Sequence, residues 1–494
     1  MTNSAERLLG RMREVADLDG IAGALSWDEE TQLPNQGHVA RGRQTACLFA
    51  IRHQRLTDPT LGDLIDSVLA DPSAPHITAA AATRLKTRRD RELKVPEDLV
   101  KRIAQTRSIA TSVWREARRT SSFALFQPQL EAVVALARER ADALRVGSDY
   151  ACRYDALLDE FEPEMTTARL QPVFDELERG LVPIVGEIST RPRPNRKFLE
   201  ATFADRAQWD FGVGLLKDLG FDLGRGRMDR STHPFTETLS EHDIRLTTRI
   251  DEADPLSAIF STVHEAGHGM FEQGFSPEHF GTPLAAAPSL GLHESQSRLW
   301  ENQVARSRAF WVHYLPKLKL AFPPLSSVTL EEFYRAVNSV ERGFIRVDAD
   351  EVTYNLHILV RFALEKALID GDLPVSAIPE TWNEKMRVYL EVSPPNDALG
   401  CLQDIHWATT AIGYFPTYTI GNLYSAQLMS AFMSRHPNAT TDFENGQFAP
   451  LLTWLREQVH RRGYLDSAEV TVRNATGRGL SVGPFLDYLR SKYL

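Results

Sequence analysis

The sequence predicts a mostly α-helical protein that contains one small β-hairpin. Across its 494 residues, apolar side chains recur mainly every three or four positions, which is the period of an amphipathic helix. One region, residues 233–250, instead alternates apolar and polar side chains in part, as half-buried strands do. No internal repeat and no low-complexity linker divides the chain. We therefore expect one large helical body with a hairpin at a single place.

Several stretches show the helical period clearly, and some begin with a recognisable cap. The stretches are residues 8–25, 130–144, 170–184, 330–340 and 356–368. Thr329 precedes the fourth stretch and is a suitable amino-terminal cap. Asp254 followed by Pro255 predicts another helix start, because Asp can accept backbone hydrogen bonds and Pro fits the first helical position.

The alternating region predicts a hairpin just before the helix that Asp254 begins. Its two strands would be residues 233–239 and 243–250, with Ser240, Glu241 and His242 forming the turn. Such a strand can bind an extended chain through backbone hydrogen bonds. A purely stabilising role is the alternative, and the two roles are compatible.

The run His264-Glu265-Ala266-Gly267-His268 is the most informative pattern in the chain. On a helix, residues four apart share a face, so the two imidazoles can converge on one metal ion. Glu265 projects toward the same opening and can act as a general base on a water molecule. Gly267 and Gly269 indicate close approach by a substrate or a neighbouring helix, or simply tight packing.

Glu294 offers a third metal ligand. It lies 26 positions beyond His268 (294 − 268), which leaves room for a Gly- and Pro-containing loop before a second helix near Leu292. Two His and one Glu leave a coordination position open for water, as in catalytic rather than structural zinc sites. Taken alone, Glu294 would by default be interpreted as an ordinary surface carboxylate. His293 is a candidate for orienting the site.

Other motifs follow in order along the chain. They are Trp27-Asp28, His233-Pro234-Phe235, Asp243/Arg245/Thr247, Ile345/Arg346/Ala349/Asp350 and Gly400/Gln403/Asp404/His406/Trp407. Together with H-E-x-x-H and the His293–Gln296 run, they make the chain resemble the carboxypeptidase Taq family of zinc metallocarboxypeptidases.

The resemblance implies a large helical metallopeptidase fold with the hairpin beside the active site. It implies a single catalytic domain over residues 1–494, in which two helical halves flank a deep substrate groove. It also implies one zinc ion per subunit, with cobalt as an alternative, and a homodimer. The expected activity is release of single carboxy-terminal residues from peptides, with broad side-chain tolerance.

A carboxypeptidase needs a cation for the terminal carboxylate of its substrate, and Arg offers a bidentate fork. Arg346 is the first candidate and Arg245 the second, with a structural ion pair as the alternative for each. His406 either lines the substrate pocket or is a buried core histidine. Tyr418 can donate a hydrogen bond to the oxyanion, or it only packs.

Two rival functions stay open. The first is an oligopeptidase that cuts internal bonds with the same catalytic residues. The second is a non-catalytic protein that binds a metal or a peptide. Glu265 argues against the second, because a structural metal site needs no base and usually has four protein ligands.

The amino-acid composition argues against nucleic acid as a partner and indicates a reducing compartment. The net charge of −10 gives no overall basic field for nucleic acid. Cys47, Cys152 and Cys401 are few, odd in number and far apart, which fits a reducing compartment. No stretch approaches about 18 uninterrupted apolar residues, and the first 20 residues carry charges throughout. We expect a cytoplasmic protein without a membrane span.

Overall fold

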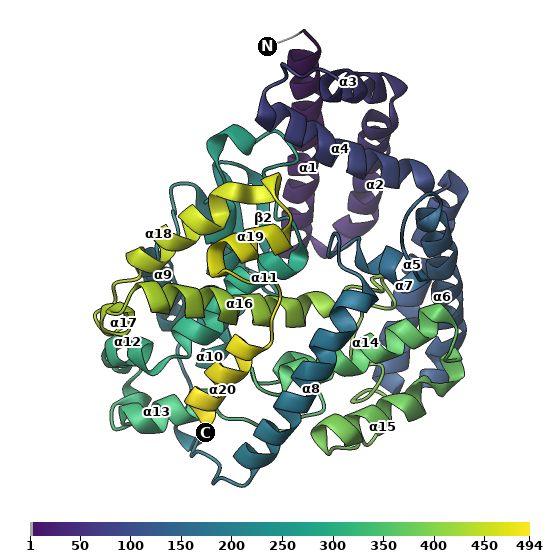
Figure 1. Cartoon of the computed structure of the whole chain (residues 1–494). Helices are drawn as coiled ribbons and strands as arrows, with labels where there is room; N and C mark the ends of the chain where they lie inside the picture. The colour runs from purple at the N-terminus through teal and green to yellow at the C-terminus, as the bar shows by residue number, and fades with distance from the viewer. Residues whose placement is uncertain (1–2) are drawn as a thin grey trace.

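A computed structural model describes residues 3–494, and helices make up most of it (Figure 1). The mostly α-helical fold expected from the sequence is confirmed. The helices are α1 (Asn3–Thr31), α2 (His38–Thr57), α3 (Pro59–Leu69), α4 (His76–Lys94), α5 (Glu97–Thr120), α6 (Phe123–Arg145), α7 (Arg153–Leu158), α8 (Thr167–Ser189), α9 (Asp205–Leu219), α10 (Pro255–Glu272), α11 (Leu290–Arg298), α12 (Arg308–Ala321), α13 (Leu330–Val337), α14 (Tyr354–Asp370), α15 (Ile378–Leu390), α16 (Pro416–Arg435), α17 (Ala439–Glu444), α18 (Ala449–Gln458), α19 (Ala468–Thr476) and α20 (Gly483–Tyr493).

Four of the five predicted helical stretches lie wholly inside observed helices, namely α1, α6, α8 and α14. The fifth ends three residues earlier than predicted, at Val337. Asn338 explains the difference, because its side-chain amide donates to the carbonyl oxygens of Tyr334 and Arg306 and so closes the helix end. At the start of α13, Thr329 forms a capping box with Glu332, as the sequence predicted.

The predicted hairpin is present as strands β2 (Thr236–Ser240) and β3 (Asp243–Thr248), which pair antiparallel. Both strands are shorter than predicted. Ser240 belongs to β2, so the turn consists of Glu241 and His242 alone. A register shift between Thr238 and Ser240 accommodates the pairing.

A third strand, β1 (Gly226–Arg230), was not predicted. It pairs in parallel with β3, which therefore lies in the middle of the sheet. Its sequence, Gly-Arg-Met-Asp-Arg, buries only Met228 and shows no extended apolar alternation. Its strand conformation comes from pairing with β3 and not from its own sequence pattern.

The sheet lies between α10 and α1. Ile244 and Leu246 of β3 are fully buried. Thr248 joins the sheet to α10 through hydroxyl contacts of 2.9 Å to Ser261 and 3.1 Å to Thr262. On the other side, α1 approaches β2 closely: a Cβ added at Gly20 would lie 2.4 Å from the carbonyl oxygen of Leu239.

The apolar core has two parts. The larger cluster extends from Val95 to Leu489 and surrounds α10, α11, α14 and α16. The smaller one belongs to helices α1 to α4, which project at the top of Figure 1, and it also includes Leu284. The predicted single catalytic domain and the substrate groove stay predictions.

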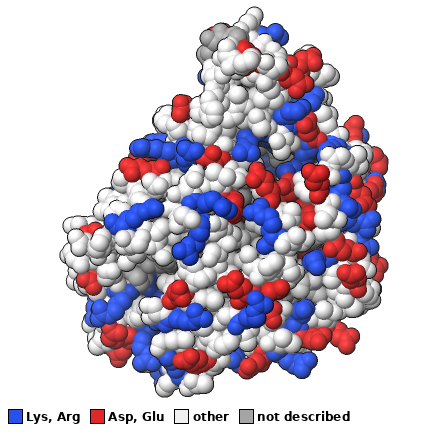
Figure 2. Space-filling model, in the orientation of Figure 1, with Lys and Arg blue, Asp and Glu red and all other residues white. Residues whose placement is uncertain are grey.

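On the face drawn in Figure 2, basic and acidic side chains are interspersed, and neither sign covers a large area. Among residues 3–494, no helix has the length and apolar character needed to cross a bilayer.

Candidate active site

Helix α10 carries the H-E-x-x-H run on its second half. Asp254 caps its start as predicted, accepting from the backbone N–H groups of Leu256 (3.2 Å) and Ser257 (3.3 Å). His264 and His268 fall on the same face one turn apart, and their ring centroids are 4.9 Å from each other.

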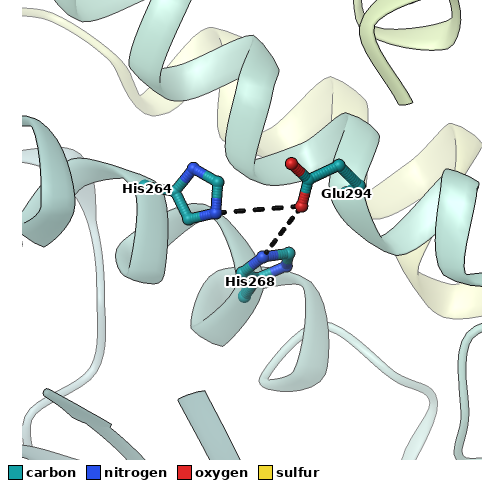
Figure 3. Close-up of side chains that lie close together, drawn as sticks. All are labelled: His264, His268 and Glu294. Atoms are coloured by element: carbon teal, nitrogen blue, oxygen red, sulfur yellow. Dashed lines mark ion pairs between the residues drawn. The ribbon is translucent and has the colours of Figure 1, made fainter. Parts of the chain in front are cut away.

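Glu294 of α11 meets the two histidines (Figure 3). Its Oε2 atom lies 3.8 Å from Nε2 of His264 and 3.5 Å from Nε2 of His268. The candidate ligand atoms of all three residues lie within 4.8 Å of one another, and no other such group occurs in residues 3–494. Two imidazole nitrogens and one carboxylate oxygen converging on one point fit a divalent metal such as zinc.

Two glycines allow the helices to come this close. A Cβ at Gly267 of α10 would lie 2.6 Å from the carbonyl oxygen of Gln296 in α11. A Cβ at Gly421 of α16 would lie 2.6 Å from Cγ of Glu294 itself. Of the explanations open for Gly267, the structure therefore shows close approach by a neighbouring helix.

Glu265 lies beside the histidines, and the sheet holds it in place. The hydroxyl of Thr236 in β2 donates to Oε2 of Glu265 at 2.8 Å and contacts its backbone oxygen at 3.1 Å. Burial raises the pKa of Glu265, although His264 and the Thr236 hydrogen bond oppose the rise. A carboxylate with a raised pKa is a better proton acceptor near neutral pH.

Glu301 holds the His264 ring on the side that faces away from Glu294. The sequence did not point to this residue. Nδ1 of His264 and Oε2 of Glu301 are 2.8 Å apart. This contact leaves Nε2 to face Glu294, so the ring is oriented with one nitrogen toward the metal position. Burial alone would lower the pKa of His264, but Glu294 and Glu301 outweigh it and raise the pKa.

Arg298 is the second residue that the sequence analysis missed. Its Nε donates to Oε1 of Glu294 at 2.7 Å, and its Nη1 donates to Oε2 of Glu301 at 3.0 Å. Burial opposes ionisation of Glu294, yet Arg298 and the histidines keep its pKa well below the usual range. The steps of four and three residues from Glu294 to Arg298 to Glu301 were a usable signal, because they place all three on one helix face.

Beyond Arg298 the helix changes form. Residues Leu299–Ala305 make a π-helix, and all seven are buried. The sequence predicted a second helix that begins near Leu292, but it did not predict this variant. Wider turns of this kind often occur at functional sites, and here one carries Glu301.

His293 lies against the ligand His268. The two rings stack with centroids 4.2 Å apart and an angle of 14° between their planes. Nε2 of His293 is 2.8 Å from Oε1 of Glu272, which fixes the ring. This position suits the orienting role predicted for His293.

Comparison with known families decides which family the chain belongs to. Residues 7–493 match the family described as carboxypeptidase Taq (M32) metallopeptidase. The chain belongs to this family. It is a metal-dependent carboxypeptidase, and the function expected from the sequence is confirmed at this level.

Individual relatives cover nearly the whole enzyme. Thermostable carboxypeptidase 1 of Thermus thermophilus is 42% identical over 99% of this chain and 98% of its own length. Carboxypeptidase 1 of Bacillus subtilis is 35% identical, with coverage of 98% and 96%. The solved M32 carboxypeptidase of Deinococcus radiodurans R1 superposes with a TM-score of 0.97 at 38% identity, covering 100% of this chain and 99% of that one.

The two arginines predicted to bind the substrate carboxylate both have carboxylate partners in this carboxypeptidase. Arg346 is buried, and its Nε and Nη2 donate to Oδ1 of Asp404 at 3.0 and 2.8 Å. Arg245 of β3 pairs with Asp243 at 2.7–2.8 Å. Each arginine therefore forms the structural ion pair that was the alternative to substrate binding. Contact of either arginine with the substrate stays a prediction.

His406 and Tyr418 lie together, with Nε2 of the histidine 3.3 Å from the phenol oxygen. The guanidinium of Arg346 lies 5.0 Å from the ring centroid of Tyr418, so three predicted substrate residues form one group. Burial lowers the pKa of His406 to about 4. Burial raises the pKa of Tyr418, which stays protonated at neutral pH and is able to donate.

Tyr354 connects this group to the metal site. Its phenol oxygen accepts from Nη1 of Arg346 at 2.8 Å, and Arg298 lies 4.8 Å from the centroid of its ring. Arg298 in turn contacts Glu294. The substrate candidates and the metal cluster thus share one chain of contacts, whereas Arg245 lies apart on the sheet beside Trp27.

Proposed function

We propose that His264, His268 and Glu294 hold one zinc ion, with cobalt as the alternative, and that Glu265 is the general base. The reaction is release of single carboxy-terminal amino acids from peptides, with broad side-chain tolerance. The observation that carries the proposal is the convergence of three ligand atoms within 4.8 Å, with the Glu265 carboxylate beside them.

When bound, the ion would polarise the scissile carbonyl and make the attacking water more acidic. Glu265 accepts the proton from that water and then delivers it to the leaving amine. Thr236 occupies Oε2 of Glu265, and Oε1 has no hydrogen bond to any residue in the range 3–494. Oε1 is therefore the oxygen that is free to accept the proton.

Recognition of the substrate end rests on the group around Arg346. Within residues 3–494, Nη1 of Arg346 donates only to Tyr354 and keeps a further N–H, so the Asp404 ion pair does not use all of the donors of Arg346. Arg346 stays the first candidate for the terminal carboxylate and Arg245 the second. Tyr418 would donate to the oxyanion, and His406 would hold the phenol in place.

The proposal includes a cytoplasmic homodimer that acts on peptides. Support for the compartment is the small number of cysteines, all of them free, of which Cys47 is exposed and Cys401 buried. The homodimer rests on family resemblance.

Mass spectrometry of a peptide digest tests the direction of attack. The enzyme is loaded separately with zinc and cobalt and given one peptide in two forms, with a free or an amidated carboxy terminus. We expect a ladder of single-residue losses from the free acid and almost none from the amide.

Internal fragments from both peptide forms would instead establish an oligopeptidase. Peptide binding without any cleavage by the metal-loaded protein would establish a non-catalytic role.

A further inference from the structure

We propose that a hollow beside the end of α10 binds a small phosphate-bearing anion. The hollow has a volume of about 380 Å³ and lies between the hairpin turn, at Glu241 and His242, and the segment that follows α10. Three arginines line it: Arg225, Arg456 and Arg461. None of the residues of the metal site lines it, so the site is separate from the catalytic centre.

Within the described part of the chain, the three arginines form no ion pair. Within residues 3–494, none of them has a carboxylate oxygen within 4.0 Å. Glu241 is the one acidic residue of the lining, and it contributes its backbone oxygen to Arg225. Most other arginines near the surface are paired, as Arg206 is with Asp210 at 2.8 Å.

Of the three arginines, Arg456 most clearly lacks a hydrogen-bond partner within residues 3–494. Its Nε atom is buried and has no hydrogen-bond partner in the described chain. Burial lowers the pKa of Arg456, Arg225 and Arg461 lower it further, and Asp222 opposes them only weakly. A partly buried cation among like charges costs folding free energy. A bound anion would offset that cost by supplying hydrogen-bond acceptors.

Arg225 is already fixed in position. Its Nε and Nη2 donate to the backbone oxygen of Glu241 at 3.0 and 2.5 Å, and its Nη1 donates to the oxygen of Gln273 at 3.0 Å. Because carbonyl oxygens are neutral, the positive charge of Arg225 stays uncompensated. Each Nη atom of Arg225 also keeps one N–H that can donate to a ligand. Because the fold already holds this side chain in place, less conformational entropy is lost when a ligand binds.

The chemistry of the lining selects the ligand class. Several guanidinium groups around one hollow suit a tetrahedral oxyanion, which accepts two parallel hydrogen bonds from each fork. The volume exceeds that of inorganic phosphate and leaves room for a small phosphate monoester. Free phosphate and a monoester share the same recognition chemistry.

Calorimetric titration of the zinc-loaded enzyme with inorganic phosphate, at fixed ionic strength, tests the site. The variants are R461A, which changes an exposed side chain, R456Q, and the exposed control R206A. We expect R461A and R456Q to weaken phosphate binding at least about tenfold, and R206A to leave it unchanged. Phosphate bound at the metal would give the same heat in every variant.

Equal affinity in all four proteins, or no binding at all, would overturn the proposal. A parallel titration with glycerol phosphate distinguishes the sources: tighter binding than phosphate identifies a monoester, and weaker binding identifies the free ion. Thermal unfolding gives a second readout that does not depend on catalysis. Phosphate should raise the unfolding temperature of the wild type but not of R456Q, and an equal rise in both would contradict the site.

Discussion

At the scale of single residues, the site depends on how each metal-binding side chain is itself held. His264 has Glu301 at Nδ1 and Glu294 on the side of Nε2, and Arg298 bridges the two carboxylates. The carboxylate at Nδ1 fixes the tautomer and makes Nε2 a stronger donor to a cation. We therefore expect Glu301 to act on metal affinity through its contact with His264.

The substitution E301Q tests this role. Gln keeps an oxygen that can accept from Nδ1 of His264 but removes the charge, so zinc affinity should fall about 10- to 100-fold. The measurement is a competition titration with a chelator of known affinity. The matched control is E331Q, which changes an exposed carboxylate paired with Arg308. Equal zinc affinity in E301Q and wild type would show that Glu301 has no positioning role.

At the scale of elements, the candidate site is made by three helices, α10, α11 and α16, that approach closely at two glycines. Gly267 brings α10 against α11, and Gly421 brings α16 against Glu294. Glu294, the proposed third ligand, is thus held between the backbone of α16 and a helix whose own backbone packs against α10. A methyl group at either glycine has to displace a neighbouring helix.

The pair G421A and G186A tests this packing. The added methyl of G421A meets Cβ and Cγ of Glu294 at 2.8 and 2.6 Å, so we expect a loss of about 1–3 kcal/mol in unfolding free energy and weaker metal binding. Gly186 lies within α8 with nothing inside 4 Å, so G186A should be neutral or stabilising by up to about 1 kcal/mol. Denaturant unfolding measures both, and equal effects would contradict the packing argument.

The difference between local sequence patterns and contacts between elements explains what the sequence could predict. His264, Glu265 and His268 are set by spacing within one helix, and Asp254 and Thr329 cap as local pattern predicts. β1 and the π-helix were missed because their form depends on contacts with other elements.

Contacts between residues that are distant in the sequence could not be predicted either. Asp404 lies 58 positions from Arg346, so the ion pair that occupies this arginine could not be read from local pattern. Thr236, which holds Glu265, is 29 positions away on a different element. The motifs pointed to His264, His268 and Glu294, which the fold brings together. The contacts that hold these side chains come from other elements and could not be predicted from the motifs.

At the scale of the whole molecule, several carboxyl groups are almost completely buried. Glu162 is one of them, and its Oε1 accepts from the N–H of Gly291, at 2.5 Å, and from the hydroxyl of Thr417, at 2.9 Å. It joins the starts of α11 and α16. Burial raises the pKa of Glu162 to about 7, although these hydrogen bonds oppose the rise.

This pKa predicts a dependence of stability on pH. The folded-state pKa of Glu162 lies above the unfolded value near 4.5, so between these values the folded state binds more protons. The contribution of Glu162 to stability therefore falls as pH rises from about 4.5 to 7, by at most about 3 kcal/mol. E162Q keeps the accepting oxygen and does not titrate. Its stability relative to wild type should rise between pH 5 and 8, and a constant difference in unfolding free energy would contradict this.

The proposed reaction of this metal-dependent carboxypeptidase depends on Glu265 as the general base. The most direct test is the rate at which E265Q, at a metal content matched to wild type, releases the last residue of a peptide. We expect the rate to fall about 10²- to 10⁴-fold while bound zinc is unchanged, because Gln cannot accept the proton of the attacking water. A rate within a few-fold of wild type, at equal metal content, would contradict the central claim.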